Sequence, residues 1–158
     1  MKKLYIKQKI SFREKFTVTD ETQNMRYEVV GKILTVGRKA TITNTLGTEV
    51  ARIEEKIVAL MPKYELIIGK EVVATIQQKV AVANQKYKVT CKGVEVKGDL
   101  MNLNFTIMRN GESIGAIKRK VFASLESFEV DIYDDSCELL VTTLVLAIAF
   151  ANEFGAVG

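Results

Sequence analysis

The stretch Leu139-Leu-Val-Thr-Thr-Leu-Val-Leu-Ala-Ile-Ala-Phe-Ala151 is apolar on almost every side. As a helix it would be about 20 Å long, whereas a bilayer core is about 30 Å thick and needs about 20 apolar residues. No Lys or Arg follows it as a membrane anchor. The stretch is flanked by acidic residues, namely Asp134, Asp135, Glu138 and Glu153. We therefore expect a buried central helix over about residues 136–154 and not a transmembrane segment.

The chain before this helix is a series of short β-rich runs separated by turn residues. Asn110-Gly111 gives the strongest hairpin signal, because both residues accept positive φ. Pro62, the only proline, is expected in a connection, and residues 32–38 and 78–85 remain open between helical turns and strands. The pattern predicts eleven or twelve strands, over Leu4–Gln8, Phe16–Thr19, Arg26–Val30, Ala40–Thr43, Glu49–Glu54, Tyr64–Ile68, Val72–Gln77, Tyr87–Cys91, Val94–Lys97, Asn104–Arg109, Ser113–Lys118 and Ser127–Tyr133.

So many strands predict a closed barrel. An all-β domain must protect the edges of its sheets, and closure into a barrel removes all of them. A barrel of about 12 strands is too wide for its own side chains to fill, and the apolar helix is the segment suited to its lumen. We predict an all-β fold with one helix: a closed antiparallel barrel around a central hydrophobic C-terminal α-helix, as a single domain over residues 1–158.

The strands contain an internal repeat. Three stretches match three later ones, namely Tyr27-Glu-Val-Val-Gly31 with Val94-Glu-Val-Lys-Gly98, Gly47-Thr-Glu-Val-Ala-Arg-Ile-Glu-Glu-Lys-Ile57 with Gly111-Glu-Ser-Ile-Gly-Ala-Ile-Lys-Arg-Lys-Val121, and Tyr64–Ile68 with Phe128–Ile132. The repeat predicts two similar sheets, about residues 16–77 and 86–133, as the halves of the barrel. The spacing of Ile114 and Ile117 breaks strict alternation and predicts a β-bulge.

Composition excludes several classes of active site. The chain has no histidine, which removes the commonest general base and metal ligand. The two cysteines, Cys91 and Cys137, are too few for an all-cysteine zinc site and are expected to be reduced. No Gly-rich phosphate loop is present. No apolar signal segment follows Met1, so we expect a cytoplasmic location. The sequence indicates no cofactor and no metal.

The formal net charge is +4, and the basic residues occur in clusters. Charge of this kind keeps outer strand faces soluble and discourages edge pairing. Alternatively, it draws the protein to an anionic surface such as a membrane leaflet. The candidate residues for binding an anionic surface are Lys86, Lys88, Lys118, Arg119 and Lys120.

The E-V-x-G-[KD]-[IL] motif, the paired G-x-x-[VI]-[AG]-x-I-x-x-K-[IV] hairpins and an apolar helix entered from Phe128-Glu-Val-Asp-Ile-Tyr133-Asp resemble the LURP-one-related family. The resemblance covers about residues 2–154. It implies the tubby C-terminal-like fold, shared with tubby proteins and phospholipid scramblases: about twelve antiparallel strands around a central hydrophobic helix. Tubby proteins bind phosphoinositides, but we match no such residue set to positions in this chain. The implied lipid function is therefore an analogy at the level of fold.

Three functions remain open. The first is a non-enzymatic binding module for anionic phospholipid headgroups or a membrane surface, with peripheral membrane association. The second is a protein–protein adaptor or scaffold, because Val72-Val-Ala-Thr-Ile76 is apolar at nearly every position and predicts burial on both faces. The third and least favoured is a carboxylate-based enzyme built on Glu129, Asp131, Asp134 and Asp135, since Asp134 and Asp135 are placed to start the helix. Nucleic-acid binding is disfavoured by the modest charge.

Overall fold

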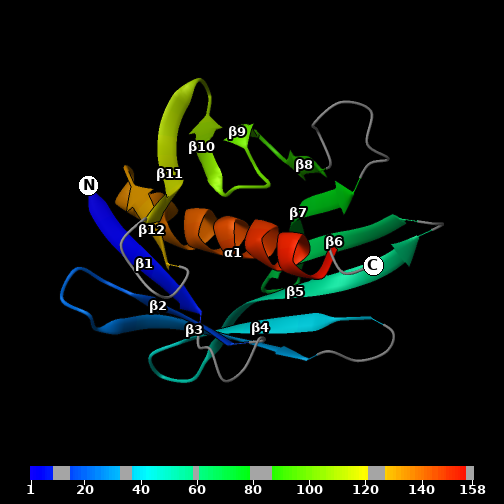
Figure 1. The fold of residues 1–158 in the computed structure, drawn as a ribbon, viewed down its shortest axis with the longest axis horizontal. Coiled ribbons are helices and arrows are strands. Elements are labelled where there is room, and N and C mark those ends of the chain that lie inside the picture. Colours follow the sequence, from blue (N-terminus) through cyan, green and yellow to red (C-terminus); the bar gives the residue numbers. More distant parts are fainter. Residues whose placement is uncertain (9–14, 33–36, 59–60, 79–86, 121–126, 156–158) are drawn as a thin grey trace.

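A computed structural model describes residues 1–8, 15–32, 37–58, 61–78, 87–120 and 127–155. This part of the chain forms twelve strands in one closed barrel around a single long helix (Figure 1). The elements are β1 (Lys2–Gln8), β2 (Lys15–Thr19), β3 (Met25–Lys32), β4 (Lys39–Asn44), β5 (Glu49–Val58), β6 (Met61–Ile68), β7 (Glu71–Gln78), β8 (Tyr87–Cys91), β9 (Val94–Asp99), β10 (Asn104–Arg109), β11 (Glu112–Lys120), β12 (Ser127–Ile132), the 3₁₀ turn η1 (Asp135–Cys137) and α1 (Glu138–Gly155).

The barrel has up-and-down topology. Each strand pairs antiparallel with the strands before and after it in the chain, and β1 closes the barrel against β12. The predicted fold class is therefore confirmed, and every predicted run lies on a strand, except that β12 ends at Ile132, one residue before the predicted end at Tyr133. Pro62 was expected in a connection, but it lies in β6 opposite Ile57. Residues 33–36 and 79–85, in the two segments left open, lie outside the described residues.

Side chains along the barrel strands alternate between the core and the outer surface. In β2, Phe16 and Val18 are buried, while Lys15 before them and Thr17 between them are more exposed. This is the period of two that places successive strand residues on opposite faces. Across the barrel the inward positions are largely aliphatic, and those that are at most 1% exposed include Leu4, Ile6, Val18, Val29, Ile42, Ile53, Leu66, Ile76, Ile107, Val130 and Ile132.

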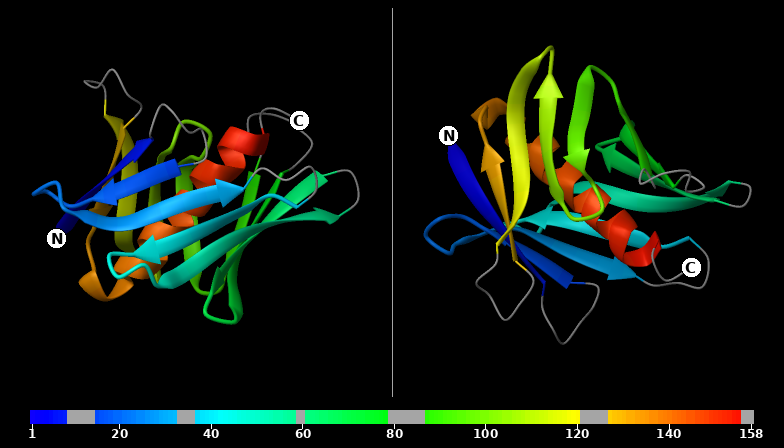
Figure 2. Two further views of the ribbon diagram at one scale, coloured as in Figure 1. Left: turned by 90° about the horizontal axis from the view of Figure 1, so that it is seen from below. Right: turned by 45° about the horizontal axis from the view of Figure 1, so that its top comes forward.

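Helix α1 is the core of the barrel (Figures 1 and 2). Every residue from Val141 to Ala151 is buried, none more than 7% exposed. These eleven residues make about three turns, so the helix is buried on all sides. Thr143 donates its hydroxyl hydrogen to the carbonyl of Leu139 at 2.7 Å, which satisfies this polar group inside the lumen. Within the described residues, one helical stretch, Asp135–Asn152, is long and apolar enough to cross a membrane, and most of it is buried in the barrel.

The predicted β-bulge is confirmed. Met108 pairs with Ser113 and Ile107 with Gly115, so Ile114 is the extra residue. An added Cβ at Gly115 would lie 2.5 Å from Cγ1 of Val141, which shows how closely β11 approaches the helix. The hairpin of β4 and β5 has its extra residue, Val50, at the position that corresponds to Ile114 in the repeat. The division into two similar sheets remains a prediction.

One neighbouring pair of strands is hardly joined. Between β8 and β9 the register contains only Cys91 opposite Val94, whereas every other neighbouring pair is matched over at least four residue pairs. Figure 2, right, shows the two strands running apart from their hairpin. The β9–β10 turn is tied to the end of the helix, because Asn152 donates to the carbonyl of Leu100 at 2.6 Å. We call the stretch along which β8 and β9 are not paired the seam.

Candidate functional site

The structure separates the five predicted cations. Lys88 lies on β8, and Lys118 and Arg119 lie on β11. Lys88 follows the buried Tyr87 and Lys118 follows the buried Ile117, so both lysines point outward. Arg119 points to the other face, where its guanidinium carbon lies 5.9 Å from the ring centre of Phe128. Lys86 and the side chain of Lys120 lie outside what the structure describes.

Lys118 borders a network of charges on the outer face. Lys3 bonds to Glu129 and to Asp131, the latter at 3.1 Å. These hydrogen bonds, the one to Glu129 first, raise the pKa of Lys3 above its usual range. Lys118 lies 3.7 Å from Glu129 and keeps 57% of its side chain exposed. Since both carboxylates are engaged by Lys3, the ammonium of Lys118 is only weakly paired and remains available at the surface.

A groove of about 380 Å³ lies beside Lys118. Its outer lining crosses four strands, β9 to β12, because Thr106 pairs with Lys97 and with Ala116, and Ala116 pairs with Asp131. Lys97 and Lys118 flank the groove, and Tyr133 adds a phenol to its lining. The small side chain of Ala116, between these larger residues, leaves the space.

Lys97 is the residue that sequence reasoning missed. It is 59% exposed, and its ion pair with Glu95 at 3.7 Å joins two exposed groups, a kind of pair that contributes little. The signal was present: Lys97 occupies an outward position of β9, and the Asn110-Gly111 hairpin fixes the strands beside it. We define the lysine face as Lys88, Lys97 and Lys118, on β8, β9 and β11.

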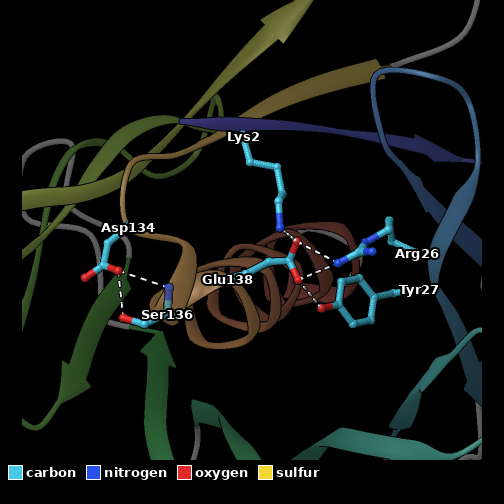
Figure 3. A network of polar contacts seen from close by, with 6 residues as sticks. All are labelled: Lys2, Arg26, Tyr27, Asp134, Ser136 and Glu138. Carbon is cyan, nitrogen blue, oxygen red and sulfur yellow. Dashed lines mark hydrogen bonds and ion pairs between the residues drawn. The ribbon is translucent and has the colours of Figure 1, made fainter.

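A second polar network closes the end of the barrel where α1 begins (Figure 3). The carboxylate of Glu138 accepts two hydrogen bonds from Nη2 of Arg26, at 3.1 and 2.9 Å, and one from the hydroxyl of Tyr27 at 2.9 Å. The ammonium of Lys2 lies 3.1 Å from the same group. The network therefore ties β1 and β3 to the first residue of the helix.

The electrostatics of this network match its geometry. Burial pushes the pKa of Glu138 upward, but hydrogen bonds from Lys2, Tyr27 and Arg26 outweigh it and hold this pKa below its usual range. Burial, followed by the hydrogen bond to Glu138, raises the pKa of Tyr27 to about 12. The carboxylate therefore stays charged, and the network holds the fold together.

The carboxylates considered for an enzyme do not converge. Glu129 and Asp131 face outward on β12 and bind Lys3. Asp134 caps η1, accepting from the backbone of Ser136 at 3.0 Å and from its hydroxyl at 2.6 Å (Figure 3). Across the described ranges, no group of three or more metal-binding side chains is found.

A closed twelve-stranded antiparallel barrel with an apolar helix as its core defines the class of protein. The sequence model of the LURP-one-related family matches residues 2–149, and the chain belongs to this family. It is 26% identical over 150 residues to YxjI of Bacillus subtilis (strain 168), described as an uncharacterized protein, with 94% of this chain and 92% of that protein covered. A solved structure of an Arabidopsis thaliana protein superimposes with a TM-score of 0.64 at 16% identity, covering 92% of this chain and 88% of that one. At this identity the likeness shows the fold alone.

Proposed function

We propose that this protein is a non-enzymatic binding module that docks on anionic membrane surfaces through the lysine face. The observation that carries the proposal is the groove flanked by Lys97 and Lys118, with Lys88 on β8, across the seam from Lys97. Because α1 fills the lumen, a ligand meets the outside of the barrel. Tyr133, 44% exposed, supplies an amphipathic ring of the kind that suits a headgroup region. This function fits a cytoplasmic protein that associates peripherally with membranes.

The expected affinity is modest and electrostatic. Each lysine near an anionic leaflet contributes about 1 kcal/mol. Three lysines therefore give a preference on the order of a hundredfold for anionic over neutral vesicles. The attraction falls off within about 10 Å at 0.1 M salt, so higher salt should release the protein.

Vesicle flotation tests the proposal. We expect the protein to float with phosphatidylcholine vesicles that contain phosphatidylserine and to stay soluble with phosphatidylcholine alone. The double variant Lys97→Glu, Lys118→Glu should lose the flotation. Lys15→Glu is the matched control, because it reverses a charge on β2, on the far side of the barrel from β8. Equal recovery of the wild-type protein in the soluble fraction with both kinds of vesicle would overturn the proposal.

A protein–protein adaptor is the second candidate, and the seam between β8 and β9 favours it. The original argument for an adaptor, burial of both faces of Val72–Ile76, does not hold. Ala74 and Ile76 are buried against the core, but Val72 is 45% exposed. The unpaired strand edges at the seam are instead the feature that suits a polypeptide partner.

A further inference from the structure

The seam presents a free strand edge. Lys92 and Gly93 form a two-residue turn, so Cys91 and Val94 are the hydrogen-bonded pair that closes the hairpin. In an antiparallel strand, backbone groups alternate between the two neighbours. The N–H groups of Val96 and Gly98 therefore point into the seam, while those of Glu95 and Lys97 point to β10. Within the described ranges, no strand pairs with β9 beyond Val94 on this side.

The side chains on the inner side of the seam are unusually open. Val89, Val94 and Val96 face inward but are only partly buried. The contrast is clearest at Val29, which occupies the position of Val96 in the first copy of the repeat and is 1% exposed. The inner side of the seam is therefore apolar and partly exposed.

Positive charge borders the outer side of the seam. Lys88 and Lys97 each lie three positions from the paired residues Cys91 and Val94, so they occupy facing positions on the two strands. Both are exposed. Among the described residues, Lys97 is paired with the exposed Glu95 alone, and no acidic side chain forms an ion pair with Lys88.

We propose that the seam binds an extended segment of another polypeptide as an added strand on the edge of β9. The backbone of the segment would pair with the N–H of Val96, as in other cases of strand addition. Alternate side chains of an added strand point to opposite faces, so apolar residues would cover Val89 and Val96 while acidic residues meet Lys88 and Lys97. Gly98, at φ +128°, ends the regular edge, so the segment is short. This site goes beyond the proposed membrane docking and does not depend on it.

Amide hydrogen exchange tests the free edge itself. In the isolated protein, the amide of Val96 should exchange at least about tenfold faster than those of Glu95 and Lys97, whose hydrogen bonds belong to the ladder with β10. Equal protection of all three amides would overturn the proposal, because the edge of β9 would then already be paired.

Binding is measured with fluorescein-labelled heptapeptides of alternating valine and glutamate, or alternating valine and lysine. Fluorescence anisotropy should show saturable binding of the glutamate peptide and at least about tenfold weaker binding of the lysine peptide. Val96→Pro removes one N–H that faces the seam, a change that edge strands tolerate, and should abolish binding. Lys15→Glu, on β2, should leave it unchanged.

Reversal of the two lysine charges distinguishes a specific loss of binding from a loss caused by misfolding. The double variant Lys88→Glu, Lys97→Glu should bind the lysine peptide in preference to the glutamate peptide, which an unfolded protein would not do. An unchanged preference, binding that survives Val96→Pro, or no binding of the glutamate peptide would each overturn the proposal. A concentration-dependent dimer lost in Val96→Pro, without peptide binding, would identify a second copy of this chain as the occupant and overturn the acidic partner.

Failure of this site and failure of membrane docking are distinguishable. Val96→Pro should lose the glutamate peptide yet still float with anionic vesicles. Lys118→Glu should weaken flotation, because it reverses a charge beside the groove, but should leave peptide binding unchanged, because Lys118 lies on β11 and away from the seam. If the wild-type protein binds the peptide but not the vesicles, the seam stands and membrane docking is wrong.

Discussion

Truncation of Leu144 tests the helix as the core of the barrel. Leu144 is 0% exposed in the middle of α1, and strands surround this part of the helix. Leu→Ala at such sites costs the lost transfer free energy plus a cavity, in total about 3 to 5 kcal/mol. A domain of this kind has a free energy of unfolding of about 5 to 15 kcal/mol. Leu144→Ala should therefore remove about a fifth or more of the free energy of unfolding, and Leu144→Asp, which buries an unpaired charge, should prevent folding.

The assay is urea unfolding followed by far-ultraviolet circular dichroism, since the chain has no tryptophan. Leu46 provides the matched control, because it lies in the β4–β5 turn and is 87% exposed. Leu46→Ala and Leu46→Asp should change the free energy of unfolding by no more than about 0.5 kcal/mol. If Leu144→Ala costs less than about 1 kcal/mol, or Leu144→Asp unfolds at the wild-type midpoint, the central-helix interpretation is wrong.

Three further predictions concern the packing and the polar network. Gly115→Ala forces a Cβ toward Val141 and should cost about 1 to 3 kcal/mol by overpacking, measured by thermal unfolding. Glu138 has a lowered pKa in the folded state, so it stabilises the folded protein above pH 4.5, its ordinary pKa, and this stabilisation is lost as the pH falls through the folded pKa. Glu138→Gln should therefore make the free energy of unfolding depend less on pH in the acid range. The pKa of Tyr27 is raised to about 12, so this residue stabilises the folded protein below pH 10.0, its ordinary pKa, and the stabilisation is lost as the pH rises through about 12. Tyr27→Phe should therefore make the free energy of unfolding depend less on pH in the alkaline range.

The strands of the barrel could be predicted from the sequence because each one has its own alternation of apolar and polar residues and its own turn residues. Asn110-Gly111 formed the expected hairpin, and the broken alternation at Ile114 marked the bulge. The prediction that Pro62 lies in a connection was wrong. Proline lacks a backbone N–H, which argues against a central strand. Pro62 lies one residue into β6, and prolines are tolerated where a strand begins.

The candidate site was harder to predict because nearness in the sequence is not nearness on a barrel. Lys118 and Arg119 are adjacent in the chain, yet alternation sends them to opposite faces. Lys97 is 21 positions away from Lys118, and the register of β9, β10 and β11 brings both to the same groove. The pairing register of these consecutive strands, and not their order in the sequence, joins the two lysines.

The seam could not be predicted from the sequence. Strands β3 and β9 share the E-V-x-G pattern, so their local preferences are the same. β3 is paired on both sides, with β2 and β4, whereas β10 is the one described strand that pairs with β9 along its length. The difference must arise from the neighbours: a strand edge is covered only if the adjacent strand runs alongside it, and β8 runs away. The same pattern that completes the wall at Val29 therefore leaves an open edge at Val96, where an added strand would restore the pairing.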